Sequence, residues 1–193
     1  MKKFIIPIGV FALLIFYVIA TYNSIVGKEE NVKQNWSEVQ NTYQRRMDLI
    51  PNLVSVVKGV SEFEKSVMQR VAELRSRASQ GLDDKTVSAE NYDRQRQLQD
   101  SLAANVNRLI VIIEAYPELQ GTKAYLALQK QLAGTERRIA VARKDFNESV
   151  FEYNKKVKSF PSSIVASVTG FKPRLGFDSV AGAEQPVEIK FNQ

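Results

Sequence analysis

The sequence predicts an all-α protein: an N-terminal transmembrane helix, then an antiparallel bundle of three to four long helices, then an irregular C-terminal tail. Three observations lead to this prediction. The chain starts with a long uncharged apolar run, its middle carries apolar side chains at helical spacing, and its last part holds three of the six prolines. The predicted boundaries are a membrane anchor at 1–24, a helical bundle at 25–160 and the tail at 161–193.

The first predicted element is the membrane anchor. Residues 4–22, FIIPIGVFALLIFYVIATY, contain no charge, and a helix of this length extends about 28 Å, close to the hydrocarbon thickness of a bilayer. A cleaved signal peptide is the alternative, because Lys2 and Lys3 before an apolar run also fit that pattern. Since the apolar face continues through Ile25 and Val26, we expect a retained single-pass anchor that contacts lipid in the bacterial cytoplasmic (inner) membrane.

The charges beside this anchor predict its orientation. Lys2, Lys3 and the amino terminus precede it, and Lys28 and Lys33 are the only basic residues among the twenty that follow it. The excess of basic residues on the cytoplasmic side of membrane helices narrowly favours a cytoplasmic N-terminus. We therefore expect the soluble domain on the periplasmic or outer side.

The next predicted element covers residues 22–79 and carries one apolar stripe, with nearly all steps of three or four residues or a sum of the two. Its members are Tyr22, Ile25, Val32, Trp36, Val39, Tyr43, Met47, Ile50, Val54, Val57, Val60, Val67, Val71, Leu74 and Ala78. Pro51 falls inside this stripe, where proline costs a helix about 3 kcal/mol. Either Asp48 caps a new helix with Pro51 in its first turn, or one helix of about 87 Å bends at Pro51. We expect a kinked or tightly broken helix without a long loop.

Two further helices are predicted after a loop at 79–91, SQGLDDKTVSAEN. The first covers about 90–115 and ends before Pro117. Its stripe is Tyr92, Leu98, Leu102, Val106, Leu109, Ile113 and Tyr116.

The last helix is predicted at about 118–160 and ends before Pro161. Its apolar residues follow heptad spacing with one stutter. They are Tyr125, Leu128, Leu132, Thr135, Ile139, Ala142, Phe146, Val150, Tyr153, Val157 and Phe160. In the tail beyond this helix, VEIKF at 187–191 could form a short strand.

The composition excludes several classes of function. The chain has no cysteine and no histidine, which removes disulfides, thiolate nucleophiles, Cys/His zinc sites and Ser–His catalytic pairs. Its net charge of +6 is spread among carboxylates, as on solvated helix faces, so a nucleic-acid partner is not expected. We expect no enzyme activity, no cofactor and no metal, because acid–base chemistry by carboxylates alone would need a cleft that raises one pKa.

A set of polar residues on the predicted helices forms the candidate interaction site. Its members are Arg45, Arg46, Asp48, Glu114, Glu136, Arg143, Asn147 and Asn154, with Pro51 in a structural role. One interpretation is a row of exposed ion pairs worth at most about 1 kcal/mol each. The other is a polar layer between helices, in which Arg45 or Arg46 meets Glu114 or Glu136 and fixes the register.

Several long motifs resemble the LemA family of bacterial membrane-anchored proteins. They are YQRRMDLIPNLVSVVKG at 43–59, EAYPEL at 114–119, LQKQLAGTERRIAVAR at 128–143 and FNESVFEYNKKVKSFPSSIVA at 146–166, after YNSIV at 22–26. Phe146 stands where the family usually has tyrosine, and Met47 where alanine is common. The resemblance implies one membrane helix and an antiparallel four-helix bundle, with a short N-terminus outside the cell, the opposite of the orientation that the charges favour.

These observations predict a non-enzymatic, membrane-anchored helical scaffold. Long amphipathic helices tend to associate, so we expect a homo-oligomer or the docking of a protein partner. The alternative is a regulatory or sensory adaptor that controls a separate membrane or envelope protein.

Overall fold

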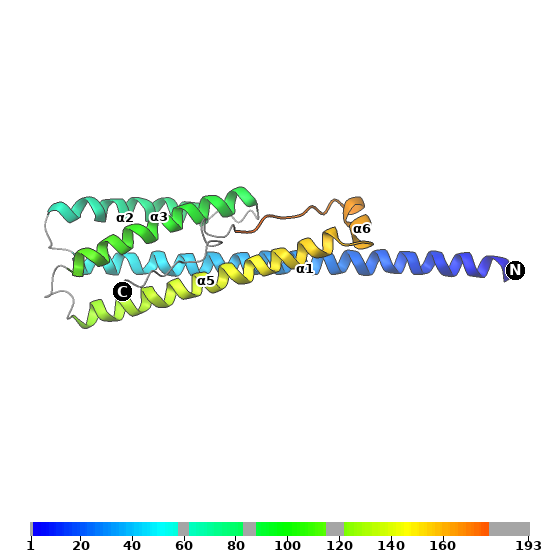
Figure 1. Ribbon diagram of the computed structural model, residues 1–193, viewed down its shortest axis with the longest axis horizontal. Coiled ribbons are helices and arrows are strands. Elements are labelled where there is room, and N and C mark those ends of the chain that lie inside the picture. Colours follow the sequence, from blue (N-terminus) through cyan, green and yellow to red (C-terminus); the bar gives the residue numbers. More distant parts are fainter. Residues whose placement is uncertain (1, 58–61, 83–87, 115–121, 178–193) are drawn as a thin grey trace, which may run out of the picture.

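The structure is a computed structural model of the 193-residue chain, and it describes residues 2–57, 62–82, 88–114 and 122–177. Within these ranges, side chains are described for all residues except 2–5, 57, 62–65, 89 and 114. The described part is all-helical, as predicted, with an elongated bundle and one long helix that extends from it (Figure 1). The elements are α1 (Lys2–Val57), α2 (Glu62–Leu82), α3 (Ala89–Glu114), α5 (Lys123–Lys158) and α6 (Ser162–Thr169).

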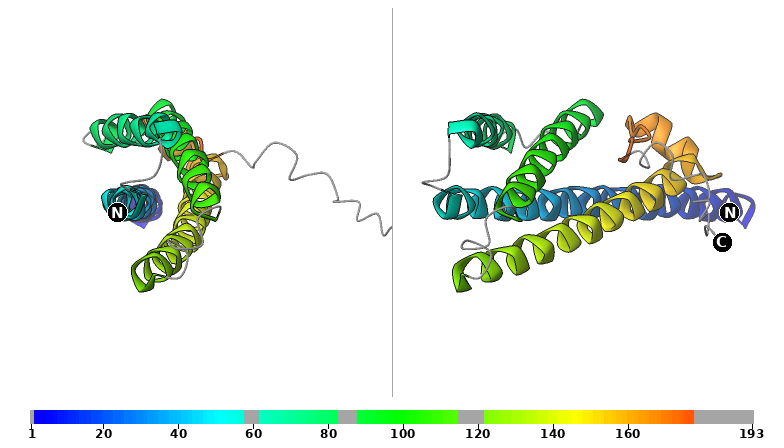
Figure 2. Two further views of the ribbon diagram at one scale, coloured as in Figure 1. Left: turned by 90° about the vertical axis from the view of Figure 1, so that its left-hand side faces the viewer. Right: turned by 60° about the vertical axis from the view of Figure 1, so that its left-hand side comes forward.

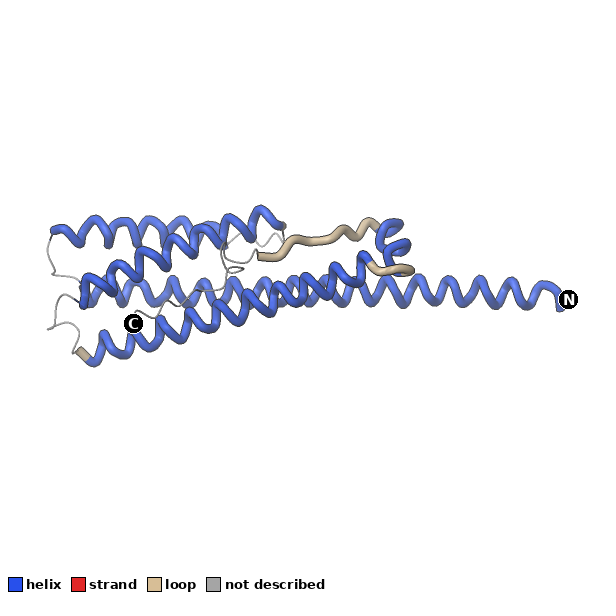
Figure 3. Tube along the Cα trace, viewed as in Figure 1, coloured by secondary structure: helices blue, strands red, loops and turns tan. Residues whose placement is uncertain are grey.

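Helix α1 is continuous from the apolar N-terminal segment into the bundle (Figure 3). Its N-terminal part projects beyond the other helices, and its apolar side chains are exposed there, with Ile6 at 74%, Leu13 at 70% and Phe16 at 71%. By length and composition this helix can cross a membrane. From Ile25 to Ile50, the apolar stripe of α1 is buried in the bundle, as its spacing predicted, whereas Val54 is only partly buried and Leu53 is buried in its place.

The predicted helix from 22 to 79 is wrong in one respect, because α1 ends at Val57 and α2 begins at Glu62. At Pro51 the helix neither ends nor begins. Asp48 is not an N-cap, since it lies in the middle of α1 and its Oδ1 accepts a hydrogen bond from Gln44 Nε2 at 2.7 Å.

A side chain from α2 explains how α1 continues through Pro51. Proline has no N–H, so the carbonyl of Met47, four residues earlier, loses its helical partner. The Nε of Arg75 donates a hydrogen bond to this carbonyl oxygen at 2.9 Å. The cost of proline in the helix is therefore partly offset by a contact between α1 and α2.

Helices α2 and α3 pack side by side and run in opposite directions (Figure 1). Both extend into the predicted loop at 79–91, since α2 continues to Leu82 and α3 begins at Ala89. The predicted stripe of α3 is partly wrong, because Gln95 and Gln99 are fully buried while Leu98 is only partly buried.

Helix α5 packs along α1 over most of the bundle, and its predicted stripe is buried up to Val157. Phe160 is the exception and is 82% exposed, because α5 ends at Lys158, before the stripe reaches it. The predicted irregular tail contains helix α6, after which the chain is extended from Phe171 to Phe177. The possible strand at 187–191 lies outside the described residues.

The core has two parts, and Figure 2 shows from two further directions the helices that build them. The distal half, farthest from the apolar N-terminal segment, is built by α1, α2, α3 and α5 around Met47, Leu74, Leu102 and Leu132. In the proximal half, α1 and α5 pack around Trp36 and Phe146, with α6 and the residues up to Phe177 against them. Helices α2 and α3 thus cover mainly the distal half.

Candidate functional site

The polar layer centres on Arg46, which is 3% exposed and lies between three helices. Its Nε donates to Glu136 Oε1 of α5 at 2.8 Å, and its Nη2 donates to Glu136 Oε2, so the pairing is bidentate. Its Nη1 donates to the backbone carbonyl of Gln99 at 2.9 Å and to Gln99 Oε1 at 3.2 Å. One guanidinium therefore joins α1, α3 and α5, which its planar donor geometry favours.

A second arginine, Arg143 of α5, makes a similar three-helix connection. Its Nε donates to the Tyr43 hydroxyl at 2.9 Å, and its Nη2 donates to Asp100 Oδ1 at 2.8 Å. Burial raises the pKa of Tyr43, although the charge of Arg143 opposes this shift. Tyr43 thus stays neutral at physiological pH and accepts the hydrogen bond.

The structure brings together some of the predicted polar residues and separates others. Arg46 meets Glu136, which was one of the predicted pairings, whereas Arg45 and Asp48 are exposed. Glu114 is the last residue of α3, and its side chain lies outside the described part of the chain.

Asn147 and Asn154 of α5 hold the extended segment Phe171–Phe177, here called the C-terminal strap. Asn147 Oδ1 accepts from the backbone N–H of Phe177 at 2.8 Å, and its Nδ2 donates to the carbonyl of the same residue at 3.1 Å. Asn154 does the same for Arg174, at 2.8 and 2.7 Å. Each amide therefore satisfies both backbone polar groups of one strap residue, as a neighbouring β-strand would.

Further contacts fix the strap along α1 and α5. Arg174 Nη2 donates to Glu29 Oε1 of α1 at 2.5 Å, and the Tyr153 hydroxyl donates to the Lys172 carbonyl at 3.0 Å. A Cβ added to Gly176 would lie 2.7 Å from Asn147 Oδ1. The strap can approach α5 this closely only because residue 176 has no side chain.

The strap ends in an aromatic cluster formed by Trp36, Tyr92, Phe146 and Phe177. The ring centroid of Trp36 lies 4.5 Å from that of Tyr92, and the centroid of Phe177 lies 5.2 Å from that of Phe146. Burial raises the pKa of Tyr92 to about 12, so its ring enters this cluster in the neutral form. The cluster joins α1, α3 and α5 to the strap.

The sequence-based prediction missed Gln95 and Gln99, although a signal for them was present, and it identified Asn147 and Asn154 but not their partner. Gln95 and Gln99 continue the three-four spacing between Tyr92 and Leu102, so polar residues on a buried stripe predict a polar layer. Asn147 and Asn154 are seven residues apart on one side of α5, which indicates a shared partner. Their actual partner, the strap, had no comparable signal.

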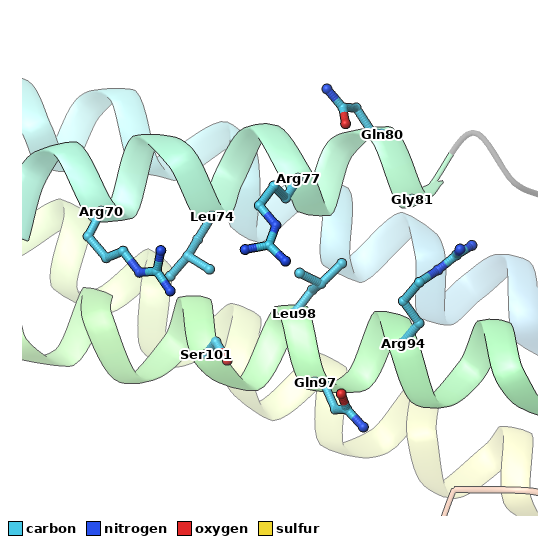
Figure 4. Close-up of a pocket in the computed structure, with 9 residues that line it drawn as sticks. All are labelled: Arg70, Leu74, Arg77, Gln80, Gly81, Arg94, Gln97, Leu98 and Ser101. Carbon is cyan, nitrogen blue, oxygen red and sulfur yellow. The ribbon is translucent and has the colours of Figure 1, made fainter.

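A surface groove of about 530 Å³ lies between α2 and α3 (Figure 4). Arg70, Arg77 and Arg94 line it, and Figure 4 shows that Arg94 points away from the other two. Arg70 and Arg77 pair with Glu73, at 2.8 and 3.7 Å. The arginines therefore do not converge on one ligand position.

The arrangement as a whole is suited to holding helices and an extended segment together. Among the described residues, no group of three carboxylate, histidine or cysteine side chains could bind a metal ion. The polar groups of buried Arg46 and of half-buried Arg143, Asn147 and Asn154 bind other parts of the same chain. Their role in the geometry is to position elements.

The known proteins that are similar in sequence to this chain include a member of the family that the motifs resemble. The chain is 24% identical to magnetosome protein MamQ of Magnetospirillum gryphiswaldense, over 96% of this chain and 75% of the relative. It is 22% identical to magnetosome protein MamQ 1 of Paramagnetospirillum magneticum, over 86% and 68%. It is also 24% identical to protein LemA of Metamycoplasma hominis, over 84% and 70%.

None of these names designates an enzyme, and together with the apolar N-terminal helix they indicate a membrane-associated protein. A comparison with protein families matches residues 35–191 to the LemA family, which is most of the chain. The resemblance predicted from the motifs is confirmed, and the protein belongs to the LemA family.

Proposed function

We propose that the protein is a single-pass, membrane-anchored scaffold that assembles with copies of itself. The observation that carries this proposal is the continuity of α1. The same helix exposes apolar side chains over its N-terminal part and supplies the buried stripe of the bundle from Ile25 to Leu53. A bundle built on the membrane helix itself takes its position from that helix, without a linker between the two.

The apolar part of α1 suits the hydrocarbon core of a membrane. Large side chains such as Ile6, Leu13 and Phe16 are mostly exposed, and exposed apolar area of this extent is expected to be covered by lipid. Lys2, Lys3 and the amino terminus on one side, against Lys28 and Lys33 on the other, narrowly favour a cytoplasmic N-terminus, with the bundle on the outer side of the inner membrane.

The outward face of α5 supports self-association. Leu126, Val141 and Phe151 are 54%, 58% and 63% exposed. At about 100° per residue, the three side chains fall within roughly a quarter of the circumference of the helix. A second copy of the chain that packs against this face would bury all three.

The test is the particle mass of the full-length protein in lipid nanodiscs or detergent. We expect an oligomer for the natural chain and a smaller particle for the Val141→Ser/Phe151→Ser variant. Val111→Ser is the matched control, because Val111 is equally exposed but lies on α3. A natural chain that is strictly monomeric at all concentrations would overturn the assembly proposal. A stoichiometric foreign partner recovered with such a monomer would favour the regulatory adaptor instead.

A further inference from the structure

Helix α6 lies at the place where α1 leaves the bundle. Phe171, just after α6, packs on Tyr22 with ring centroids 5.6 Å apart, and Tyr22 is the last residue of the predicted membrane span 4–22. Helix α6 also packs directly against α1 and α5. Figure 1 shows α6 beside α1, with its axis running across the direction of α1. If α1 crosses a bilayer, α6 is therefore at the depth of the lipid headgroups and lies along the membrane plane.

The two faces of α6 differ in what covers them. Ser162, Val165 and Ala166 are buried against the bundle. Ile164 and Val168, four residues apart and so on one face, are 58% and 83% exposed. A short helix that turns apolar side chains away from its own core needs another apolar environment for them.

Phe160 extends this exposed apolar surface. It lies in the turn between α5 and α6, and it is 82% exposed although the stripe of α5 predicted it to be buried. Aromatic side chains are favoured at the boundary between lipid and water. Phe160, Ile164 and Val168 are together called the juxtamembrane surface below.

The segment that carries this surface is basic in sequence, although one of its basic residues, Arg174, pairs with Glu29 of α1. Residues 155–177 contain five basic residues and no acidic residue. The basic residues are Lys155, Lys156, Lys158, Lys172 and Arg174. Basic residues beside an apolar face attract a membrane that contains anionic lipids.

We propose that the juxtamembrane surface is a second membrane contact, which rests in the headgroup region of the anionic bilayer that α1 crosses. This inference rests on the proposed function, in that residues 4–22 span that bilayer. A second contact prevents the bundle from tilting or rotating about α1. It gives the scaffold a defined orientation, with α5 presented at a fixed angle to neighbouring copies.

The test uses single cysteines, because the chain has none and each introduced thiol is labelled uniquely. Ile164→Cys and Val168→Cys, in the full-length chain in anionic nanodiscs, carry an environment-sensitive fluorophore. Leu13→Cys reports on the anchor, and Val111→Cys, on α3, is the control for an exposed position away from α6. The readouts are quenching by spin-labelled lipid and quenching by aqueous iodide.

We expect lipid quenching at positions 164 and 168 to be several-fold stronger than at 111, and to weaken in neutral nanodiscs. Iodide should quench strongly only at 111. Lipid quenching at 13 with iodide access at 164 and 168 would overturn this inference but leave the anchor intact. Shielding of 164 and 168 from both quenchers would also overturn it, because a second copy would then cover the surface. Absence of lipid quenching at 13 would contradict the anchor itself.

Discussion

The distal and proximal halves of the bundle reach similar burial by different means. In the distal half, four helices enclose apolar side chains such as Leu74, Leu102 and Leu132. In the proximal half, α1 and α5 are covered by α6 and by the strap, an extended segment without helical hydrogen bonds of its own. The comparison shows that an extended chain can replace helices if side chains satisfy its backbone.

The two halves meet at polar contacts. Arg46 ties α1 to α3 and α5 at this junction, and Arg143 repeats the connection through Tyr43 and Asp100. Polar side chains with fixed partners specify one register of packed helices, whereas apolar side chains tolerate several. The junction is thus where the relative placement of the halves is specified.

The largest expected effect comes from this junction. Arg46→Ala should lower the free energy of unfolding by about 3 kcal/mol, because Gln99 and Glu136 lose their charged donor. Urea unfolding followed by circular dichroism measures the change. Arg45→Ala is the control, because Arg45 directly precedes Arg46 in α1 and is exposed. Equal effects of the two substitutions would contradict the role given to Arg46.

A smaller effect is expected in the proximal half. Phe177→Ala should destabilise the protein by about 2 kcal/mol, less than a typical buried phenylalanine, because the strap can detach locally. Near-ultraviolet circular dichroism should show loss of the aromatic cluster, while the helical signal stays. Val111→Ala removes an exposed apolar side chain of α3 that lies outside the aromatic cluster and should change neither signal.

Within the distal half, Pro51 and Arg75 should be energetically coupled. Arg75→Ala should cost about 1.5 kcal/mol in the natural chain, where Arg75 supplies the donor that Pro51 lacks. In the Pro51→Ala background, the backbone N–H of residue 51 can bond the Met47 carbonyl, so the cost of losing Arg75 should shrink. A double-mutant cycle measures this coupling, and a cost that is independent of residue 51 would refute the explanation.

The smallest effects concern two helical glycines. Gly134→Ala should stabilise α5 by about 0.8 kcal/mol, since a Cβ there meets nothing within 4 Å. Gly81→Ala should bring no such gain, or should destabilise the protein. The added Cβ would lie 2.0 Å from Nε2 of Gln95, whose side chain is fully buried. Thermal unfolding compares them, and Gln95→Ala in the Gly81→Ala background should restore the gain if this contact is the cause.

Sequence patterns predicted the distal half better than the proximal half. Apolar spacing identified the buried faces of α1 and α5, since helical periodicity is a local property. The end of α1 at Val57 was missed because the apolar spacing of the sequence continues in phase through Val60 and Val67. Phe160 was assigned to the core because its spacing fitted a helix that ends two residues earlier.

The candidate site was less predictable from sequence. The contact between Arg46 and Glu136 was one of four pairings that the sequence left open, beside the alternative of exposed ion pairs. The partners of Asn147 and Asn154 were not predicted. A side-chain amide that binds backbone groups gives no information about which residues it holds. Such contacts depend on the path of the chain rather than on matching side chains.

The central claim is that the strap replaces a helix pair in the proximal half through Asn147 and Asn154. Hydrogen exchange of the Asn147→Ala/Asn154→Ala variant in nanodiscs tests it most directly. We predict faster exchange at the amides of Arg174 and Phe177 and in residues 28–43 of α1, with residues 67–78 and 98–113 unchanged. Unaltered exchange in the strap, or equal acceleration in both halves, would contradict the claim.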